Sequence, residues 1–93
     1  MMKKLTLILA LLCATPASAA CYADYKAKQE NPLRLHYGVA ALPDNACNAG
    51  AASQLLAQRL GGGGWQLLNV VSVFDDSGLN SRRAEAGQYF LRF

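Results

Sequence analysis

The chain has 93 residues, of which 53% are hydrophobic and 16% charged, with nine Lys and Arg, six Asp and Glu, and a net charge of +3. This length allows one domain, which is too small to bury a large apolar core. Removal of Lys3 and Lys4 with a leader leaves seven basic against six acidic residues, a balance that argues against a nucleic-acid-binding protein with a clustered positive surface.

Residues 1–19 have the pattern of a secretory signal peptide. Lys3 and Lys4 give a basic start, residues 5–14 form an apolar run, and 17–19 (Ala-Ser-Ala) supply the small residues of a cleavage site. The apolar run has about ten residues, roughly half of what a membrane span needs, so we expect no retained transmembrane helix. Cleavage after residue 19 or 20 predicts a periplasmic or secreted bacterial protein.

Loss of the leader also removes Cys13 and leaves Cys21 and Cys47. Two cysteines in a small exported domain most simply form a disulfide. The bridge would close a loop of about 27 residues and stabilise the domain by about 3.5 kcal/mol if unstrained. A lipid anchor on Cys21 is the alternative, because this residue follows the cleavage region. Ser18 is unusual for a lipoprotein signal, which normally has a leucine-like residue there.

Residues 20–32 are polar and weakly patterned, and we interpret them as an N-terminal extension that the disulfide tethers. From residue 33 the sequence alternates between two sets, with Leu33, Leu35, Tyr37 and Val39 on one side and Arg34, His36 and Gly38 on the other. A period of two predicts a half-buried strand, with the first set facing the core.

A helix is expected next, capped at its start by Asn48 or Asn45. Its apolar face would consist of Ala52, Leu55, Leu56 and Leu60. Residues 65–74 are mostly β-branched, aromatic or leucine and predict a strand covered on both faces. Residues 75–87 are interpreted as a polar loop and 88–93 as a last strand.

Four consecutive glycines, 61–64, separate the helix from Trp65. A phosphate-binding glycine loop leads from a strand into a helix, so that amide groups and the positive end of the helix dipole face the anion. Here the helix comes first and its carbonyl end faces the glycines, which disfavours an anion. We therefore interpret the run as a structural turn, with Gly61 as a left-handed helix cap and Gly64 turning the chain into the Trp65 strand.

These elements predict one α+β domain over residues 33–93, with a small, mainly antiparallel three-stranded sheet. The expected order is strand–helix–strand–strand, and the single helix packs across one face. In a regular strand, Leu68, Val70 and Phe74 would lie opposite Leu67, Val71 and Val73. The second face would then be covered by the tyrosine-bearing residues 21–32 or by another chain.

The run Leu60-Gly61-x-x-Gly64-Trp65-x-Leu67-Leu68-x-Val70 follows an amphipathic helix and precedes an aromatic strand that ends near Arg92. This pattern resembles the bacterial domain-of-unknown-function family 4177, whose members have a Leu-Gly-x-x-Gly-Trp-Glu-Leu-Val core. The resemblance covers roughly residues 33–93 and implies a small strand–helix–strand–strand domain with no established activity and no catalytic residues to transfer. The chain departs from the family at Gln66, where members usually have Glu, and in its exported two-cysteine extension.

His36 is the only histidine and a candidate general base or metal ligand, but no other His or Cys lies within three residues of it. A metal site needs three or four ligands, and nucleophilic catalysis needs a base beside a nucleophile. Neither pattern is present in the sequence. We therefore expect no enzyme, no metal and no cofactor.

The function that best fits this pattern is protein binding, by self-association or to an unknown partner. The expected contact residues are large, amphipathic or cationic side chains, namely Tyr22, Tyr25, Tyr37, Tyr89, Arg82 and Arg83. An alternative is a small disulfide-stapled inhibitor or ligand-binding protein that inserts the 75–87 loop.

Overall fold

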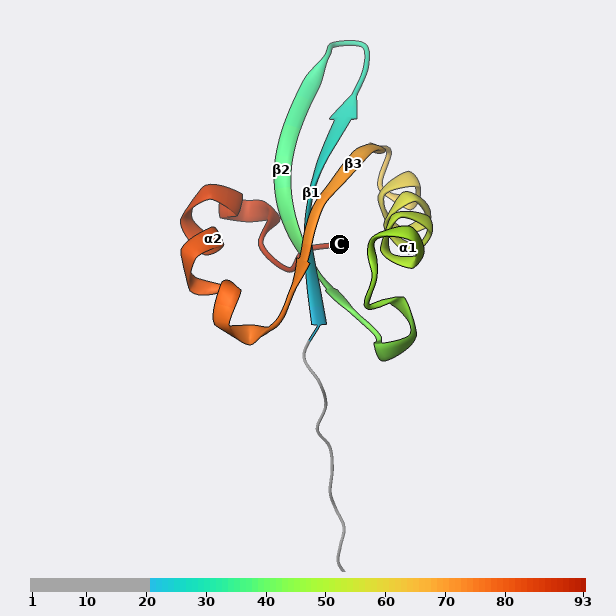
Figure 1. Ribbon diagram of the computed structural model, residues 1–93. Coiled ribbons are helices and arrows are strands. Elements are labelled where there is room, and N and C mark those ends of the chain that lie inside the picture. Colours follow the sequence, from blue (N-terminus) through green and yellow to red (C-terminus); the bar gives the residue numbers. More distant parts are fainter. Residues whose placement is uncertain (1–20) are drawn as a thin grey trace, which may run out of the picture.

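The computed structural model describes residues 21–93, so the predicted signal peptide lies outside the described residues. Three strands, β1 (Cys21–Gln29), β2 (Arg34–Leu42) and β3 (Gln66–Phe74), form an antiparallel sheet in the order β2-β1-β3. Two helices, α1 (Ala49–Gly62) and α2 (Asn80–Ala86), lie on opposite sides of this sheet (Figure 1). The predicted small α+β fold with an antiparallel three-stranded sheet is confirmed.

The central strand β1 corrects the interpretation of residues 20–32 as an extension. Its alternate residues face α1 and are buried, namely Cys21, Ala23, Tyr25 and Ala27. The pattern was missed because two of these residues are alanines and because Asp24, on the other face, is also buried. The order is therefore strand–strand–helix–strand–helix, and not strand–helix–strand–strand.

The C-terminal part also differs from the prediction. Residues 75–87 are not a loop, because they contain the 3-10 turn η3 (Asp76–Gly78) and helix α2. Residues 88–93 are not a regular strand, because the first two belong to another 3-10 turn, η4 (Gly87–Tyr89), and the segment forms only one bridge, a parallel one between Phe90 and Val39 of β2. Ala86 is buried and holds α2 against the sheet. The polar composition of this segment gives no indication of that contact.

The core lies between α1 and the sheet. Leu56 and Leu60 of α1 are fully buried against β1, as is Tyr25 in the middle of that strand. Tyr25 lies opposite Gly38 of β2, and a Cβ atom at residue 38 would approach Tyr25 Cζ to 2.6 Å. Glycine is therefore needed at residue 38, because the Tyr25 ring occupies the space that a side chain would fill.

At the beginning of β2, the side chains that face the core are the opposite set from the predicted one. Leu33 and Leu35 are 64% and 67% exposed, whereas His36 and Gly38 are buried on the face that α1 covers. The reason is that the β1–β2 hairpin extends beyond both helices (Figure 1). We call its residues 28–35 the hairpin arm. A strand period predicts which residues share a face, but not which face is covered at each point along the strand.

Strand β3 departs from a regular period of two. The register with β1 shifts twice, which leaves Leu68 and Val71 without a partner residue, each 48% exposed. Two such β-bulges turn Leu67, Val70 and Val73 to the same face, where they pack on the α1 core. The predicted grouping of Val70 with Leu68 and Phe74, and of Val71 with Leu67 and Val73, is therefore wrong.

At the glycine run, α1 ends at Gly62 and the chain continues into β3, as the sequence predicts. The left-handed residue is Gly64, with φ 84°, and not Gly61, which is still helical. The Trp65 N–H donates to the Leu60 carbonyl at 2.9 Å and the Gly64 N–H to the Gly61 carbonyl at 3.1 Å. These two bonds are a Schellman cap, which satisfies the last carbonyl groups of the helix.

Alanine at Gly61 and at Gly64 is expected to have opposite effects on stability. A Cβ at Gly61 meets nothing within 4 Å, so Gly61→Ala should raise the free energy of unfolding by about 0.5–1 kcal/mol through helix propensity. Gly64→Ala should lower it by about 1 kcal/mol, because an L-residue is strained at positive φ. Urea unfolding followed by Trp65 fluorescence measures both. Destabilisation by Gly61→Ala would contradict the assigned helix end.

The structure contains the predicted disulfide between Cys21 and Cys47, with Cα atoms 5.9 Å apart. The bridge ties the first residue of the central strand to the segment between the 3-10 turn η2 (Asp44–Ala46) and α1. A sulfur in this bond cannot also carry a lipid thioether, so the arrangement favours the disulfide over lipidation of Cys21. Among residues 21–93, no helix has the length and apolar character needed to cross a membrane.

Candidate partner-binding surface

A buried carboxylate lies between the sheet and α2. Asp24 of β1 is 4% exposed and accepts hydrogen bonds from the Tyr37 hydroxyl at 2.7 Å, the Ser72 hydroxyl at 2.6 Å and Arg82 Nε at 3.0 Å. Burial alone would raise the pKa of Asp24, but the hydrogen bonds from Ser72 and Tyr37 and the Arg82 charge outweigh it and leave the pKa below its ordinary value. The carboxylate is therefore held ionised.

This cluster accounts for two of the predicted contact residues. The Arg82 guanidinium also stacks over the Phe74 ring at 4.0 Å and donates from Nη1 to the Gly78 carbonyl at 2.7 Å. Burial and the hydrogen bond to Asp24 raise the pKa of the Tyr37 hydroxyl. Arg82 and Tyr37 thus fasten α2 to the sheet, and these polar groups are occupied within the domain.

A second cluster surrounds His36 on the other face. The imidazole stacks on the Tyr89 ring with centroids 3.7 Å apart, and the Trp65 ring meets it edge-on at 4.3 Å. His36 Nε2 is hydrogen-bonded to the Tyr25 hydroxyl at 3.0 Å, and the buried Nδ1 has no hydrogen-bond partner within residues 21–93. Phe93 extends the stack, with its ring 5.9 Å from His36. His36 therefore helps to seat the C-terminal segment on the sheet.

The stability of the domain is expected to fall in mild acid because of His36. Burial and the Arg92 charge lower the pKa of His36, while the unfolded chain has the ordinary value of about 6.5. Below that pH the unfolded state binds the proton more readily, so the free energy of unfolding decreases as the pH falls toward the folded pKa. His36→Phe, which keeps an aromatic ring but cannot titrate, should flatten this dependence in urea unfolding at pH 8 and pH 5.

The control for this prediction is Arg92→Gln, which removes the facing cation and should raise the His36 pKa measured by NMR titration. The other titratable groups that face the ring are the Tyr25 and Tyr89 hydroxyls, and burial raises the pKa of Tyr25 to about 12. An unchanged pH dependence in His36→Phe would contradict the assignment.

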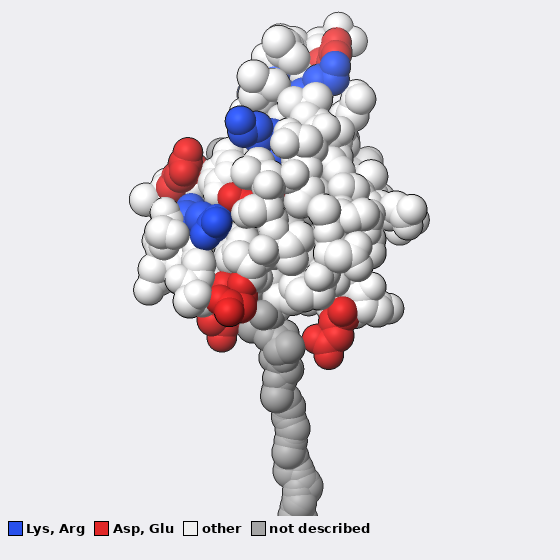
Figure 2. All heavy atoms as spheres, viewed as in Figure 1, with Lys and Arg blue, Asp and Glu red and all other residues white. Residues whose placement is uncertain are grey.

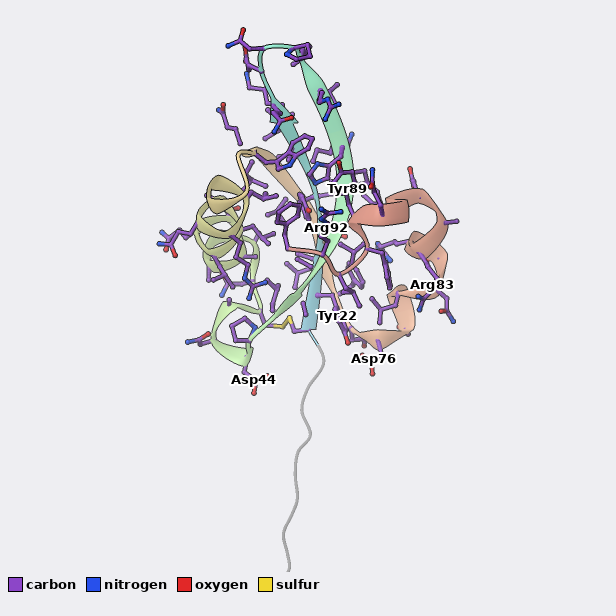
Figure 3. All side chains as sticks on the ribbon, turned by 180° about the vertical axis from the view of Figure 1, so that it is seen from behind. Tyr22, Asp44, Asp76, Arg83, Tyr89 and Arg92 are labelled. Atoms are coloured by element: carbon purple, nitrogen blue, oxygen red, sulfur yellow. A yellow bond between two sulfur atoms is a disulfide. The ribbon has the colours of Figure 1, made fainter. Side chains whose placement is uncertain are left out.

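The predicted contact residues do not form one surface. Tyr25 is fully buried, so its prediction as a partner contact is wrong, and burial raises its pKa to about 12. Tyr22 stacks on Phe74 at 6.0 Å near one end of the sheet, and Tyr89 lies beside Arg92 toward the hairpin end (Figure 3). Arg83 points away from the sheet side of α2, with its guanidinium 4.3 Å from the Phe90 ring.

The structure gives the other predicted features the following places. Cys21 and Cys47 form the bridge, Gly64 and Trp65 form the helix cap, and Gly61 lies within the last turn of α1. Within residues 21–93, no three His, Cys, Asp or Glu side chains are grouped so that they could hold a metal ion.

The most exposed apolar side chains lie at the hairpin arm and the beginning of β3. Leu35 is 67% exposed, and near it Leu68 of the first bulge is 48% exposed. They line an open groove of about 320 Å³ together with Lys26, Ala27, His36 and Tyr37. We call it the apolar groove. Exposed leucines beside a concave surface are typical of protein contacts.

A second groove, of about 370 Å³, also borders Leu35 and is lined by Arg34, Trp65, Gln88 and Tyr89. We call it the basic groove, since Arg34 lines it and the Arg92 guanidinium lies 5.8 Å from the Tyr89 ring. On the face drawn in Figure 2, acidic side chains gather at the end far from the hairpin, and others lie beside basic side chains higher up and at the hairpin tip. The hairpin itself has Lys26, Lys28 and Arg34 against Glu30, an excess of positive charge.

Sequence reasoning missed Leu35, which lines both grooves, and Leu68, which lines the apolar groove. Leu35 was expected in the core because it alternates with polar residues, and Leu68 was expected in a regular strand. Recognition of residues 21–29 as strand β1 could have revealed these two leucines. A long β1–β2 hairpin must extend beyond a single short helix, and its end is then exposed. No protein-family model, curated protein sequence or solved structure matches the chain, so the resemblance to family 4177 stays a prediction.

Proposed function

We propose that this protein is an exported, non-enzymatic domain that binds another protein through the hairpin arm. The observation that carries the proposal is the pair Leu35 and Leu68, which are 67% and 48% exposed and both line the apolar groove. A large exposed leucine in a groove loses its contact with water only when a partner covers it, which favours association.

Export is supported by the leader pattern and by the disulfide. Residues 1–19 have the basic start, apolar run and small-residue cleavage site of a secretory signal, and Cys21 is bonded to Cys47. Disulfides persist in oxidising compartments, so a periplasmic or secreted location agrees with the bond.

The alternative of an inhibitor that inserts residues 75–87 has less support. That segment is folded as η3 and α2, and Arg82 within it is hydrogen-bonded to Asp24 of the central strand. Insertion into another protein's cleft would require this contact to break. The non-enzymatic assignment rests on the sequence pattern and on the internal use of His36 and Asp24.

Site-specific photocrosslinking in the native host tests the proposed function. A photoreactive amino acid is placed at Leu35 in one strain and at Gln54, an exposed residue of α1, in a matched control strain. We expect a discrete adduct of one mass from residue 35, suppressed when Leu68→Ser is added, and none from residue 54. Self-association would give an adduct with twice the mass of the domain. Equal labelling at both sites, or none at residue 35, would overturn the proposal.

A further inference from the structure

Two hydrogen bonds establish which backbone groups of β2 point outward, away from β1. The Val39 carbonyl accepts from the Leu91 N–H at 2.7 Å, and the Ala41 carbonyl accepts from Arg59 Nη1 at 2.7 Å, both on the side away from β1. Backbone groups along a strand alternate in direction, so those of residues 35 and 37 also point outward. Within residues 21–93, the only bridge at this edge is the one at Val39, and the outward backbone groups of residues 35 and 37 form no backbone hydrogen bond, so this short stretch is open to pairing.

The two grooves lie on opposite sides of this open edge. Side chains of β2 alternate between the faces of the sheet, so that Leu35 and Tyr37 lie on the face of α2 and Arg34 and His36 on that of α1. The apolar groove contains Leu35, Tyr37 and Leu68, whereas the basic groove contains Arg34, Trp65 and Tyr89. A strand added to the edge would send successive side chains alternately into the two grooves.

The charges beside the basic groove are positive, whereas on the face of α2 the carboxylate of Glu85 acts on Tyr37. Within residues 21–93, the ion pairs are Lys28–Glu30 and Arg82–Asp24, so Lys26, Arg34 and Arg92 have no carboxylate partner. Glu30, the acidic residue of the hairpin turn, is bound to Lys28 at 2.6 Å. Cations without partners beside a groove favour a ligand with acidic side chains. A second copy of the chain would instead bring the same cations together, which disfavours self-pairing at this edge.

We infer that the outer edge of β2 at residues 34–37 binds an extended segment of a partner protein by strand addition, and that this segment alternates apolar and acidic side chains. Its apolar side chains enter the apolar groove beside Leu35 and Leu68. Its carboxylates enter the basic groove and pair with Arg34 and Arg92. The inference rests on the proposed binding function and specifies the partner's chemistry and conformation.

The test uses the oxidised domain and synthetic peptides of defined sequence. The probe is the capped heptapeptide Val-Glu-Leu-Glu-Val-Glu-Val. One control peptide has the same composition with its acidic residues placed together, and another has Lys in place of Glu. We expect the alternating acidic probe to change Trp65 fluorescence and to slow the amide hydrogen exchange of residues 35 and 37 in NMR spectra. The two control peptides should bind at least tenfold more weakly.

Two variants separate the backbone contribution from the charge contribution. Leu35→Pro removes one outward N–H group that does not pair with β1, and it should abolish binding while the urea midpoint changes little. Arg34→Glu reverses an exposed charge and should shift the preference from the acidic peptide to the lysine peptide. Leu33→Pro, in the hairpin turn and outside the 34–37 edge, is the matched proline control and should leave binding of the peptide probe unchanged.

The outcomes distinguish this inference from the proposed function. A Leu35 crosslink in the host together with no effect of any peptide on residues 35 and 37 would overturn strand addition and leave the binding function standing. Equal binding of the acidic and lysine peptides would overturn the assigned charge of the partner. Absence of the Leu35 crosslink in the host would overturn the proposed function itself.

Discussion

Replacement of Arg82 by alanine is expected to lower the free energy of unfolding by about 3 kcal/mol, because it leaves the Asp24 carboxylate buried without its counter-charge. The side chain of Asp24 is 6% exposed and that of Arg82 27%, so the effect should lie at the lower end of what breaking a buried pair costs. The lost stacking of the guanidinium on Phe74 adds to it. Urea unfolding at pH 7 measures the difference.

The pH dependence of this effect has a defined sign. The pKa of Asp24 is lowered in the folded protein, so its contribution is present above the unfolded pKa of about 4 and is lost as the pH falls through the folded pKa. The gap between the parent protein and Arg82→Ala should therefore narrow in acid. Arg83→Ala is the matched control on the same helix and should cost no more than about 1 kcal/mol. Equal effects of the two variants would contradict the role of the Asp24 cluster.

Loss of the disulfide is expected to lower the free energy of unfolding by about 3.5 kcal/mol. The bridge between Cys21 and Cys47 spans a sequence separation of 26 residues and joins the central strand to the turn before α1. Because Cys21 is buried in the core, alanine is the suitable replacement at both positions. Urea unfolding of Cys21→Ala/Cys47→Ala, compared with the oxidised parent, gives the difference.

The reducing agent supplies the control for the disulfide. Dithiothreitol should destabilise the parent protein by a similar amount and should not change the unfolding of the double alanine variant. A reduced parent as stable as the oxidised protein would contradict the assigned contribution of the bridge.

The sequence predicted the parts of the fold that depend on local signals. Asn48 caps α1 by accepting the Ala51 N–H at 2.9 Å, as its position predicted, and the α1 core residues Leu56 and Leu60 are buried. The reversed polarity of the glycine run correctly placed a helix end before β3. These features depend on residues within a few positions of one another, so a single sequence contains the information.

The parts that the sequence did not predict depend on contacts between distant residues. In the sequence, Asp24 has the properties of a surface residue. Only the fold shows that Arg82, 58 positions later, neutralises its charge. The bulges in β3 arise from its pairing with β1, and no local pattern reports them. The exposure of Leu35 follows from the length of the hairpin relative to the helices, and so the candidate site was found only in the folded domain.

Assignment of the partner surface to the hairpin depends on the open edge of β2. The same edge is closed further along, where the C-terminal segment crosses it at Val39. Phe93 of this segment lies so close to Gly63 that a Cβ atom at residue 63 would be 2.8 Å from its ring. The C-terminal segment therefore covers one part of the edge and leaves the part beside Leu35 accessible. A domain with exposed strand edges is prone to pair with other strands, and the cations at this edge restrict which strands fit.

Amide hydrogen exchange of the free oxidised domain, measured residue by residue by NMR, tests this claim most directly. The account predicts an alternation along β2, in which the amides of Leu35 and Tyr37 exchange rapidly while those of His36 and Gly38, which point toward β1, are protected. Protection of Leu35 and Tyr37 to the same degree as their neighbours would show that the edge is already covered, and it would contradict the assigned binding surface.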